Sequence, residues 1–91
     1  MSMRAVITVI GNDKLGIIAG VSHILAEHKV NILDISQTIM QGFFTMVMLV
    51  DLEKTEIPFV DLLDKVSDKG KEMDVEIRIQ HEDIFNSMHR I

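Results

Sequence analysis

The sequence predicts a single α+β domain whose elements follow the order βαββαβ, and three observations support this. The chain has 91 residues, which suits one domain and leaves no room for two. Two segments carry apolar residues at helical spacing, and four carry the patterns of strands. The dipeptide Gln41-Gly42 is a candidate two-residue hairpin turn between the second strand and the third.

The first part of the chain is predicted to hold a strand, a loop and a helix. Residues 3–10 are mostly apolar and β-branched, which is typical of a strand. Residues 11–16 form a loop rich in residues that break regular structure. Residues 15–29 are predicted to be helical because suitable side chains recur at helical spacing: Ile17, Val21, Ile24, Leu25 and His28.

The predicted hairpin consists of residues 30–40 and 43–51. The first strand alternates between two faces, with Leu33, Ile35 and Ile39 on one and Asp34, Ser36 and Thr38 on the other. The second strand is apolar on both, with Phe43, Val47 and Leu49 on one side and Phe44, Met46, Met48 and Val50 on the other. Antiparallel sheets with one wet face alternate more cleanly than this. We therefore expect something to cover the second face or extend the sheet edge, and predict a homodimer.

The chain continues with a helix, a strand and a tail. Pro58 is expected at the first position of a helix that carries Phe59, Leu62, Leu63, Val66 and Met73, and Gly70 either lies inside this helix or ends it. Residues 74–81 alternate as a strand and complete a domain of residues 1–81. The tail, residues 82–91, carries the apolar stripe Ile84, Phe85, Met88 and Ile91. This stripe predicts a short amphipathic helix packed on the open sheet face of its own subunit or of the partner.

Together these elements predict a ferredoxin-like fold. Right-handed crossovers on either side of the hairpin give a four-stranded antiparallel sheet with both helices on one face, followed here by the short C-terminal helix. A chain this short buries only roughly 60% of its unfolded surface, so association would stabilise it. Because this fold hosts many functions, function has to be argued from particular residues.

Composition argues against several classes of function. The formal net charge is −5 and there is no basic patch, so nucleic-acid binding is not expected. The absence of cysteine excludes disulfides and thiolate metal sites and suits the reducing cytoplasm, where we expect the protein. The longest apolar stretches are too short to span a membrane. The histidines match no trusted spacing of metal ligands, so neither a metal nor a cofactor is expected.

The loop before the first helix is the most informative stretch. Asp13-Lys14-Leu15-Gly16 lies between a strand and a helix N-terminus, where free backbone N–H groups and the helix dipole favour an anion such as a carboxylate. Asn31, at the start of the second strand, supplies an amide that can donate and accept hydrogen bonds. Structural interpretations also stay open: Asp13 as a helix cap, Gly16 as a packing glycine and Asn31 as a residue that satisfies a turn.

At these residues the chain resembles the ACT domain family, over roughly residues 4–81. The resemblance combines the βαββαβ order with Asp13-x-Leu15-Gly16 at the strand–helix turn and Asn31-Ile32 opening the second strand. It implies a regulatory module that binds an amino acid or related effector between the first loop of one subunit and the second-strand region of another. It further implies dimerisation through the second strand. The implied ligand shell is Asn12, Asp13, Leu15, Gly16, Asn31 and Ile32.

The chain is also similar to small bacterial proteins made of one ACT domain and a short tail. With no attached catalytic domain, any regulated enzyme or regulator protein would have to be reached in trans. Catalysis by the chain itself is not expected, since acylphosphatases of this architecture need a first-loop arginine where this chain has Lys14. RNA-binding domains of this architecture need exposed aromatics on both central strands, and the first strand has none. The main alternative is a protein–protein adaptor or dimerisation module without a small-molecule ligand.

Overall fold

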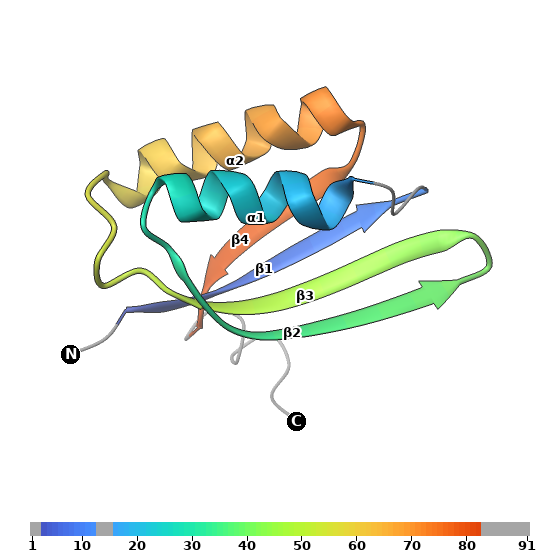
Figure 1. The fold of residues 1–91 in the computed structure, drawn as a ribbon, viewed down its shortest axis with the longest axis horizontal. Helices are drawn as coiled ribbons and strands as arrows, with labels where there is room; N and C mark the ends of the chain where they lie inside the picture. Colours follow the sequence, from blue (N-terminus) through green and yellow to red (C-terminus); the bar gives the residue numbers. More distant parts are fainter. Residues whose placement is uncertain (1–2, 13–15, 83–91) are drawn as a thin grey trace.

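The structure is a computed structural model that describes residues 3–12 and 16–82 (Figure 1). Its elements follow the predicted order: β1 (Arg4–Gly11), α1 (Ile17–Glu27), β2 (Asn31–Met40), β3 (Phe43–Asp51), α2 (Phe59–Met73) and β4 (Glu76–His81). The predicted C-terminal helix lies outside the described residues, as do Asp13 and Leu15 of the predicted ligand shell. What was predicted of them therefore stays a prediction.

The four strands form one antiparallel sheet in the order β2-β3-β1-β4. Figure 1 shows α1 and α2 on one face of this sheet, with β2 along the edge farthest from them. The ferredoxin-like fold is thereby confirmed. Along the two central strands, Arg4 lies opposite Asp51 and Gly11 lies opposite Phe44. These two pairs mark the Arg4 end and the Gly11 end of the sheet.

The core lies between the sheet and the two helices. Alternate residues of β1 and β3 are buried there: Ala5, Ile7, Val9, Phe44, Met46, Met48 and Val50. They pack against apolar stripes on the helices, which comprise Ile17, Val21 and Leu25 of α1 and Leu62 and Val66 of α2. Burying each large side chain is worth about 1.5–3 kcal/mol, so this layer holds the helices on the sheet.

β3 is apolar on both faces, as its sequence predicts. Its helix-side residues are buried, whereas on the opposite, open face Val47 and Leu49 are half-buried and Phe43 is 54% exposed. The turn before β3 is the predicted two-residue turn, since Gln41 (φ 48°) and Gly42 (φ 86°) both have the positive φ that a type I′ turn requires. The open face thus carries apolar side chains that neither α1 nor α2 covers.

β2 departs from the simple alternation predicted for residues 30–40. The register shifts between Ile32 and Asp34, so Leu33 has no partner on β3. The regular alternation predicted through Leu33 is therefore interrupted, because a β-bulge adds one residue to the strand, whereas Ile35 and Ile39 share one face as predicted. Ile35 and Ile39 lie on the helix side yet are 38% and 61% exposed, since β2 is the edge strand farthest from the helices.

α2 (Phe59–Met73) includes Gly70, and it begins one residue later than predicted from Pro58. Pro58 is the residue that caps the helix, one position before the predicted one. Gly70 lies inside the helix and is buried, and a Cβ there would sit 3.0 Å from the carbonyl oxygen of Val75 and 3.1 Å from Cγ1 of Ile77. The Val75 backbone N–H donates to the Gly70 carbonyl at 2.9 Å. Glycine is needed here because the chain entering β4 passes directly against the helix.

Candidate functional site

The connection between β1 and α1 is shaped by two glycines with different roles. Gly11 is buried, and a Cβ there would lie 2.6 Å from Cγ1 of Val75 and 3.3 Å from Cδ1 of Ile17. Gly16 caps α1 with φ 79°, and no described atom comes within 4 Å of where its Cβ would be. The packing glycine is therefore Gly11, and Gly16 is required by its left-handed backbone conformation. Contacts among the described residues give no support to the packing interpretation of Gly16.

The first turn of α1 presents backbone donors. No described side chain makes a capping hydrogen bond at Gly16, and the first turn contains no acidic residue. The first N–H groups of a helix have no acceptor within the helix, and the helix dipole places partial positive charge there. An anion can therefore be held at this end of α1. Asn12, which precedes the gap in the described residues, is exposed beside it.

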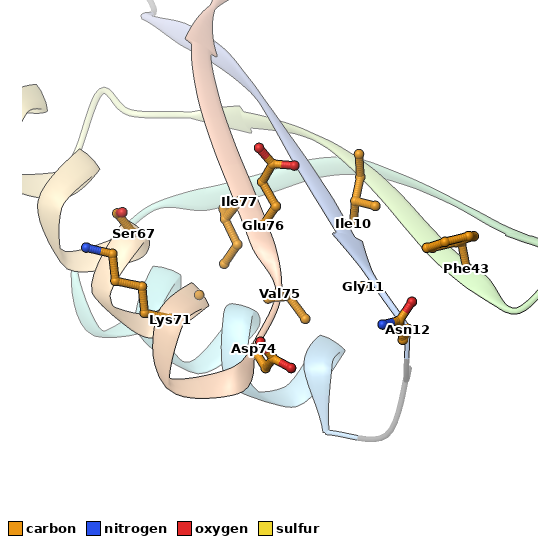
Figure 2. Close-up of a pocket in the computed structure, with 11 residues that line it drawn as sticks. Ile10, Gly11, Asn12, Phe43, Ser67, Lys71, Asp74, Val75, Glu76 and Ile77 are labelled. Atoms are coloured by element: carbon orange, nitrogen blue, oxygen red, sulfur yellow. The ribbon is translucent and has the colours of Figure 1, made fainter.

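An open cavity of about 680 Å³ lies next to Asn12. It is bounded by the end of β1, the start of β4 and the last turns of α2. Figure 2 shows Ser67 and Lys71 on one side of β4 and Asn12 with Phe43 on the other. These polar groups do not converge on one point, so the cavity offers separate hydrogen-bonding groups along a groove. Its described lining residues do not form the clustered nucleophile and base that acyl or phosphoryl transfer would need.

Asn31 lies at the Arg4 end of the sheet, opposite Asp51. A cavity of about 240 Å³ is lined there by Asn31, Asp51, Glu53 and Lys54. The Oδ1 atom of Asp51 accepts a hydrogen bond of 2.9 Å from the Glu53 backbone N–H. The side chain of Asn31 is exposed and bonds to no other described residue, so the turn-satisfying role considered for it is not seen. Its amide is available to a ligand.

The register separates the two halves of the predicted ligand shell. Gly11 pairs with Phe44 and Asn31 pairs with Asp51, which lie seven residues apart on β3. At 3.4 Å per residue the separation is roughly 24 Å. One subunit therefore brings Asn12 together with Gly16, but leaves Asn31 and Ile32 at the far end. A small ligand cannot touch both halves within one subunit.

Within residues 3–12 and 16–82, no three histidine or acidic side chains come together as a metal site. The tail residues Asp83 and His89 lie outside the described residues. His23, 73% exposed, lies 3.5 Å from Glu27 one turn along α1. Neither described helix is both long and apolar enough to cross a membrane.

A family model of the ACT domain matches residues 4–80. The chain belongs to the ACT domain family. A UPF0237 protein from Clostridium acetobutylicum is 61% identical to it over 89 residues, covering 98% of this chain and 100% of that protein. The structure of an ACT domain protein from Streptococcus pneumoniae is 42% identical, with a TM-score of 0.83 over 93% of this chain and 96% of that one.

The same fold also occurs within a larger chain. The structure of a formyltetrahydrofolate deformylase from Pseudomonas syringae matches 89% of this ACT domain but only 28% of its own chain, at 22% identity and a TM-score of 0.77. This likeness shows the fold alone. ACT domains are generally regulatory modules that bind ligands, which is the level of function that membership of the family establishes.

Sequence reasoning missed the charged groups that surround Asn31 in this ACT domain. Asp51, Glu53 and Lys54 share its cavity but come from the end of β3 and the turn after it. Pairing back from the turn at Gln41-Gly42 would have placed Asn31 within one residue of Asp51. The remaining one-residue error is the β-bulge in β2.

Proposed function

We propose that this ACT domain binds a small amino acid or a related carboxylate at sites shared by the two subunits of a homodimer, and that occupancy regulates a partner enzyme or regulator in trans. The separation of the half-sites by the length of the sheet carries this proposal. Asn12 and Gly16 at one end, and Asn31 and Ile32 at the other, form one site only if a second subunit joins the two ends.

The free edge of β2 supplies a geometry for such a dimer. β2 is an edge strand of 10 residues, whose outward backbone groups can pair with another strand. If two copies pair antiparallel about a two-fold axis, the Asn31 end of each β2 meets the Met40 end of the other. Met40 lies opposite Phe43, next to the Gly11 end. Each Asn31 would therefore lie at the same end of the joined sheet as the β1–α1 loop of the other subunit, with that subunit's β2 and β3 between Asn31 and β1.

The apolar side chains of β2 give this pairing a driving force. Ile35 and Ile39 lie on the helix side and are 38% and 61% exposed. A second copy of α1 and β2 beside them would bury both, and burial of a large aliphatic side chain is worth about 1.5–3 kcal/mol. The same contact that closes the two sites would thus stabilise a domain that is small for independent folding.

The chemistry of the combined site suits a zwitterion. The first N–H groups of α1, which no described side chain caps, would take the carboxylate. The amide of Asn31 would fix the ligand's orientation, and the carboxylate of Asp13, whose place in the fold lies outside the described residues, would attract an ammonium group. Because no nucleophile and base of the described residues converge here, we propose a binding module and not an enzyme. Its cysteine-free composition suits the cytoplasm.

A thermal-shift screen against the common amino acids and their derivatives tests the proposal. A ligand at about one hundred times its Kd stabilises the folded state by roughly 2.7 kcal/mol. For a domain of this size each kcal/mol moves Tm by about 4–8 °C, so a true ligand stands out. Asn31→Ala should reduce the shift by removing a bond to a charged group, worth about 1.5–3 kcal/mol and so at least about tenfold in affinity.

Gln37→Ala is the matched control, because Gln37 is an exposed amide in the middle of β2. It should leave the ligand-induced shift unchanged, and neither variant should move the Tm of the free protein by much. Light scattering on the same samples should show a dimer at tens of micromolar. A monomer, or an Asn31→Ala variant that binds as well as the parent, would contradict the shared site.

A screen in which no compound shifts Tm would favour the adaptor function instead. One observation supports that alternative: Phe43 on the open face and Val60 on α2 are 54% and 65% exposed. Large apolar side chains at the surface can form protein–protein contacts without any small ligand. If the protein is a dimer and no compound in the screen shifts its Tm, we would therefore assign it to the adaptor class.

A further inference from the structure

The open face of the sheet is covered unevenly. Its residues on β1 are Arg4, Val6, Thr8 and Ile10, which alternate with the helix-facing residues. Val6 is only 6% exposed although both helices lie on the other face, whereas Ile10 is 39% exposed. The burial of Val6 therefore comes from what lies on the open face at the Arg4 end, including its neighbours Leu49 and Gln80, and Ile10 lacks comparable cover.

The same division runs along β3. Leu49 and Val47 lie opposite Val6 and Thr8 and are half-buried, whereas Phe43, beyond Thr45, is 54% exposed. We call Val6, Val47 and Leu49 the near patch, and Ile10 and Phe43 the far patch. The near patch lies at the Arg4 end and the far patch at the Gly11 end.

The chain leaves β4 on the side of the near patch. β4 ends at His81, which pairs with Ala5 and so faces the helices. The next residue, Glu82, forms an ion pair with Arg4, which lies on the open face. Hydrogen bonding to the Arg4 guanidinium lowers the pKa of the Glu82 carboxyl, so the pair stays charged at neutral pH. This contact directs the segment after Glu82 onto the open face.

The length and pattern of the remaining nine residues, 83–91, match the near patch. As a helix they would be about 13 Å long. From Arg4 to Thr8 along β1 is also about 13 Å. The stripe Ile84, Phe85, Met88 and Ile91 would line one side of such a helix. A segment of this length covers the near patch and ends short of Ile10.

We propose that residues 83–91 fold back as an amphipathic helix onto the near patch of their own subunit, with Arg4 and Glu82 as the ion pair that starts the docking. The choice of the own subunit follows from reach. Two residues span at most about 7 Å, so Ile84 stays within reach of the Arg4 end of its own subunit's sheet, where Val6 lies two residues from Arg4. The docked tail prevents two sheets from stacking face to face at this end and leaves the far patch open.

Cross-linking in the full chain tests the docking. Because the chain has no cysteine of its own, the two introduced cysteines are the only ones that can form a disulfide. Thr8 lies in the middle of the open face, so the double variant Thr8→Cys with Met88→Cys should oxidise to a disulfide within one chain. Gln37→Cys with Met88→Cys is the matched control, because Gln37 is exposed and pairs with the helix-facing Met46 on the other side of the sheet. A disulfide between two chains in the Thr8 variant would place the tail on the partner and overturn the proposal. Equal oxidation of the two variants would show an undocked tail.

Fluorescence gives a second readout that needs no disulfide geometry. The chain has no Trp or Tyr, so Phe85→Trp introduces a single reporter. Its emission should be blue-shifted and protected from acrylamide in the folded protein, and adding Thr8→Arg should shift it to the red. Adding Gln37→Arg instead should leave the emission wavelength and the acrylamide protection of this indole unchanged. An indole as accessible as in the unfolded chain would overturn the proposal. Because neither readout involves a ligand, this test fails or succeeds independently of the proposed amino-acid site.

Discussion

The two ends of the sheet contribute different kinds of group to the proposed site. At the Gly11 end the contribution is backbone: Gly16 holds φ 79°, and Gly11 leaves no space for a Cβ against Val75. At the Arg4 end it is exposed side chains, such as Asn31 and Glu53, on a strand edge and the following turn. Backbone shape is tied to folding, whereas an exposed amide is not. Substitutions of the two glycines at the Gly11 end should therefore lower stability, and substitutions at the Arg4 end should change binding or tail docking with little effect on stability.

The largest effect is expected from Gly11→Ala. The new Cβ would lie 2.6 Å from a β-branched side chain, Val75, so a strand or the start of α1 must shift. Overpacking of this kind destabilises by typically about 1–3 kcal/mol. Urea unfolding should show that loss, and Tm should fall by about 4–8 °C for each kcal/mol. Asn31→Ala, measured in parallel, should unfold like the parent; equal losses for both variants would remove the contrast between the ends.

Ile39→Lys should weaken the proposed dimer while changing the folded subunit little. Ile39 lies opposite Phe44, near the Gly11 end, and is 61% exposed, so a lysine there is solvated in a single subunit. In a β2-edge dimer the same lysine would be partly buried beside apolar groups, which is unfavourable for a charge. The dimer Kd should rise at least about tenfold, equivalent to 1.4 kcal/mol. Sedimentation over a dilution series measures it.

Thr38→Lys is the control for that prediction, because Thr38 neighbours Ile39 but faces the open side of the sheet. It should leave the Kd of the dimer near that of the parent. If Thr38→Lys dissociates the dimer and Ile39→Lys does not, the two subunits meet through their open faces and the shared site has to be abandoned.

Gly16→Ala separates backbone conformation from packing at the Gly11 end. No described atom would clash with the new Cβ, but φ 79° is unfavourable for alanine by roughly 1–2 kcal/mol. We expect a stability loss of about 1 kcal/mol, smaller than that of Gly11→Ala, visible as a lower urea midpoint. Gly16→Asn should recover part of it, since asparagine tolerates the left-handed region. An alanine variant as stable as the parent would show that this turn relaxes freely.

Local sequence patterns predicted the helices and strands, but they did not predict features that depend on contacts between elements. The alternation in β3 and the turn at Gln41-Gly42 each follow from a few neighbouring residues, so the hairpin was predictable. The place of Gly70 was not, because glycine inside a helix is unfavourable by about 1 kcal/mol and only contact with Val75 and Ile77 explains it. The bulge at Leu33 likewise depends on how β2 meets β3 and not on β2 alone.

The residues of the candidate site can be proposed from the sequence, but their arrangement within one subunit cannot. A helix N-terminus after a loop and an amide at a strand start can both be identified from the sequence. Their separation by the length of the sheet follows from the register of β1, β3 and β2 together. For the same reason the sequence left open whether Asn31 met the loop within one subunit or across two. Register between distant strands, set by tertiary packing, places Asn31 and the loop at opposite ends of the sheet within one subunit.

The smallest predicted effect distinguishes two ion pairs by their exposure. Arg4 and Glu82 have side chains 42% and 27% exposed, whereas Lys29 and Glu56 are 60% and 72% exposed. In each pair, hydrogen bonding to the cation lowers the pKa of the carboxyl below its ordinary value of 4.5. A lowered pKa means that the pair stabilises the folded state above about pH 4.5 and that this contribution is lost as pH falls through the folded-state pKa.

Glu82→Gln should therefore flatten the acid side of the stability profile more than Glu56→Gln, because solvent screens the more exposed pair. Urea midpoints measured from about pH 6 down to about pH 3 give the comparison, with both variants expected to match the parent most closely at the acid extreme. If the docked tail depends on this ion pair, the indole of Phe85→Trp should become accessible over the same acid range, and Glu82→Gln should expose it already at neutral pH. A Glu82→Gln profile that keeps the parent's full acid slope would mean that the Arg4 contact contributes nothing to folding, and the Arg4 end would then hold the tail by apolar burial alone.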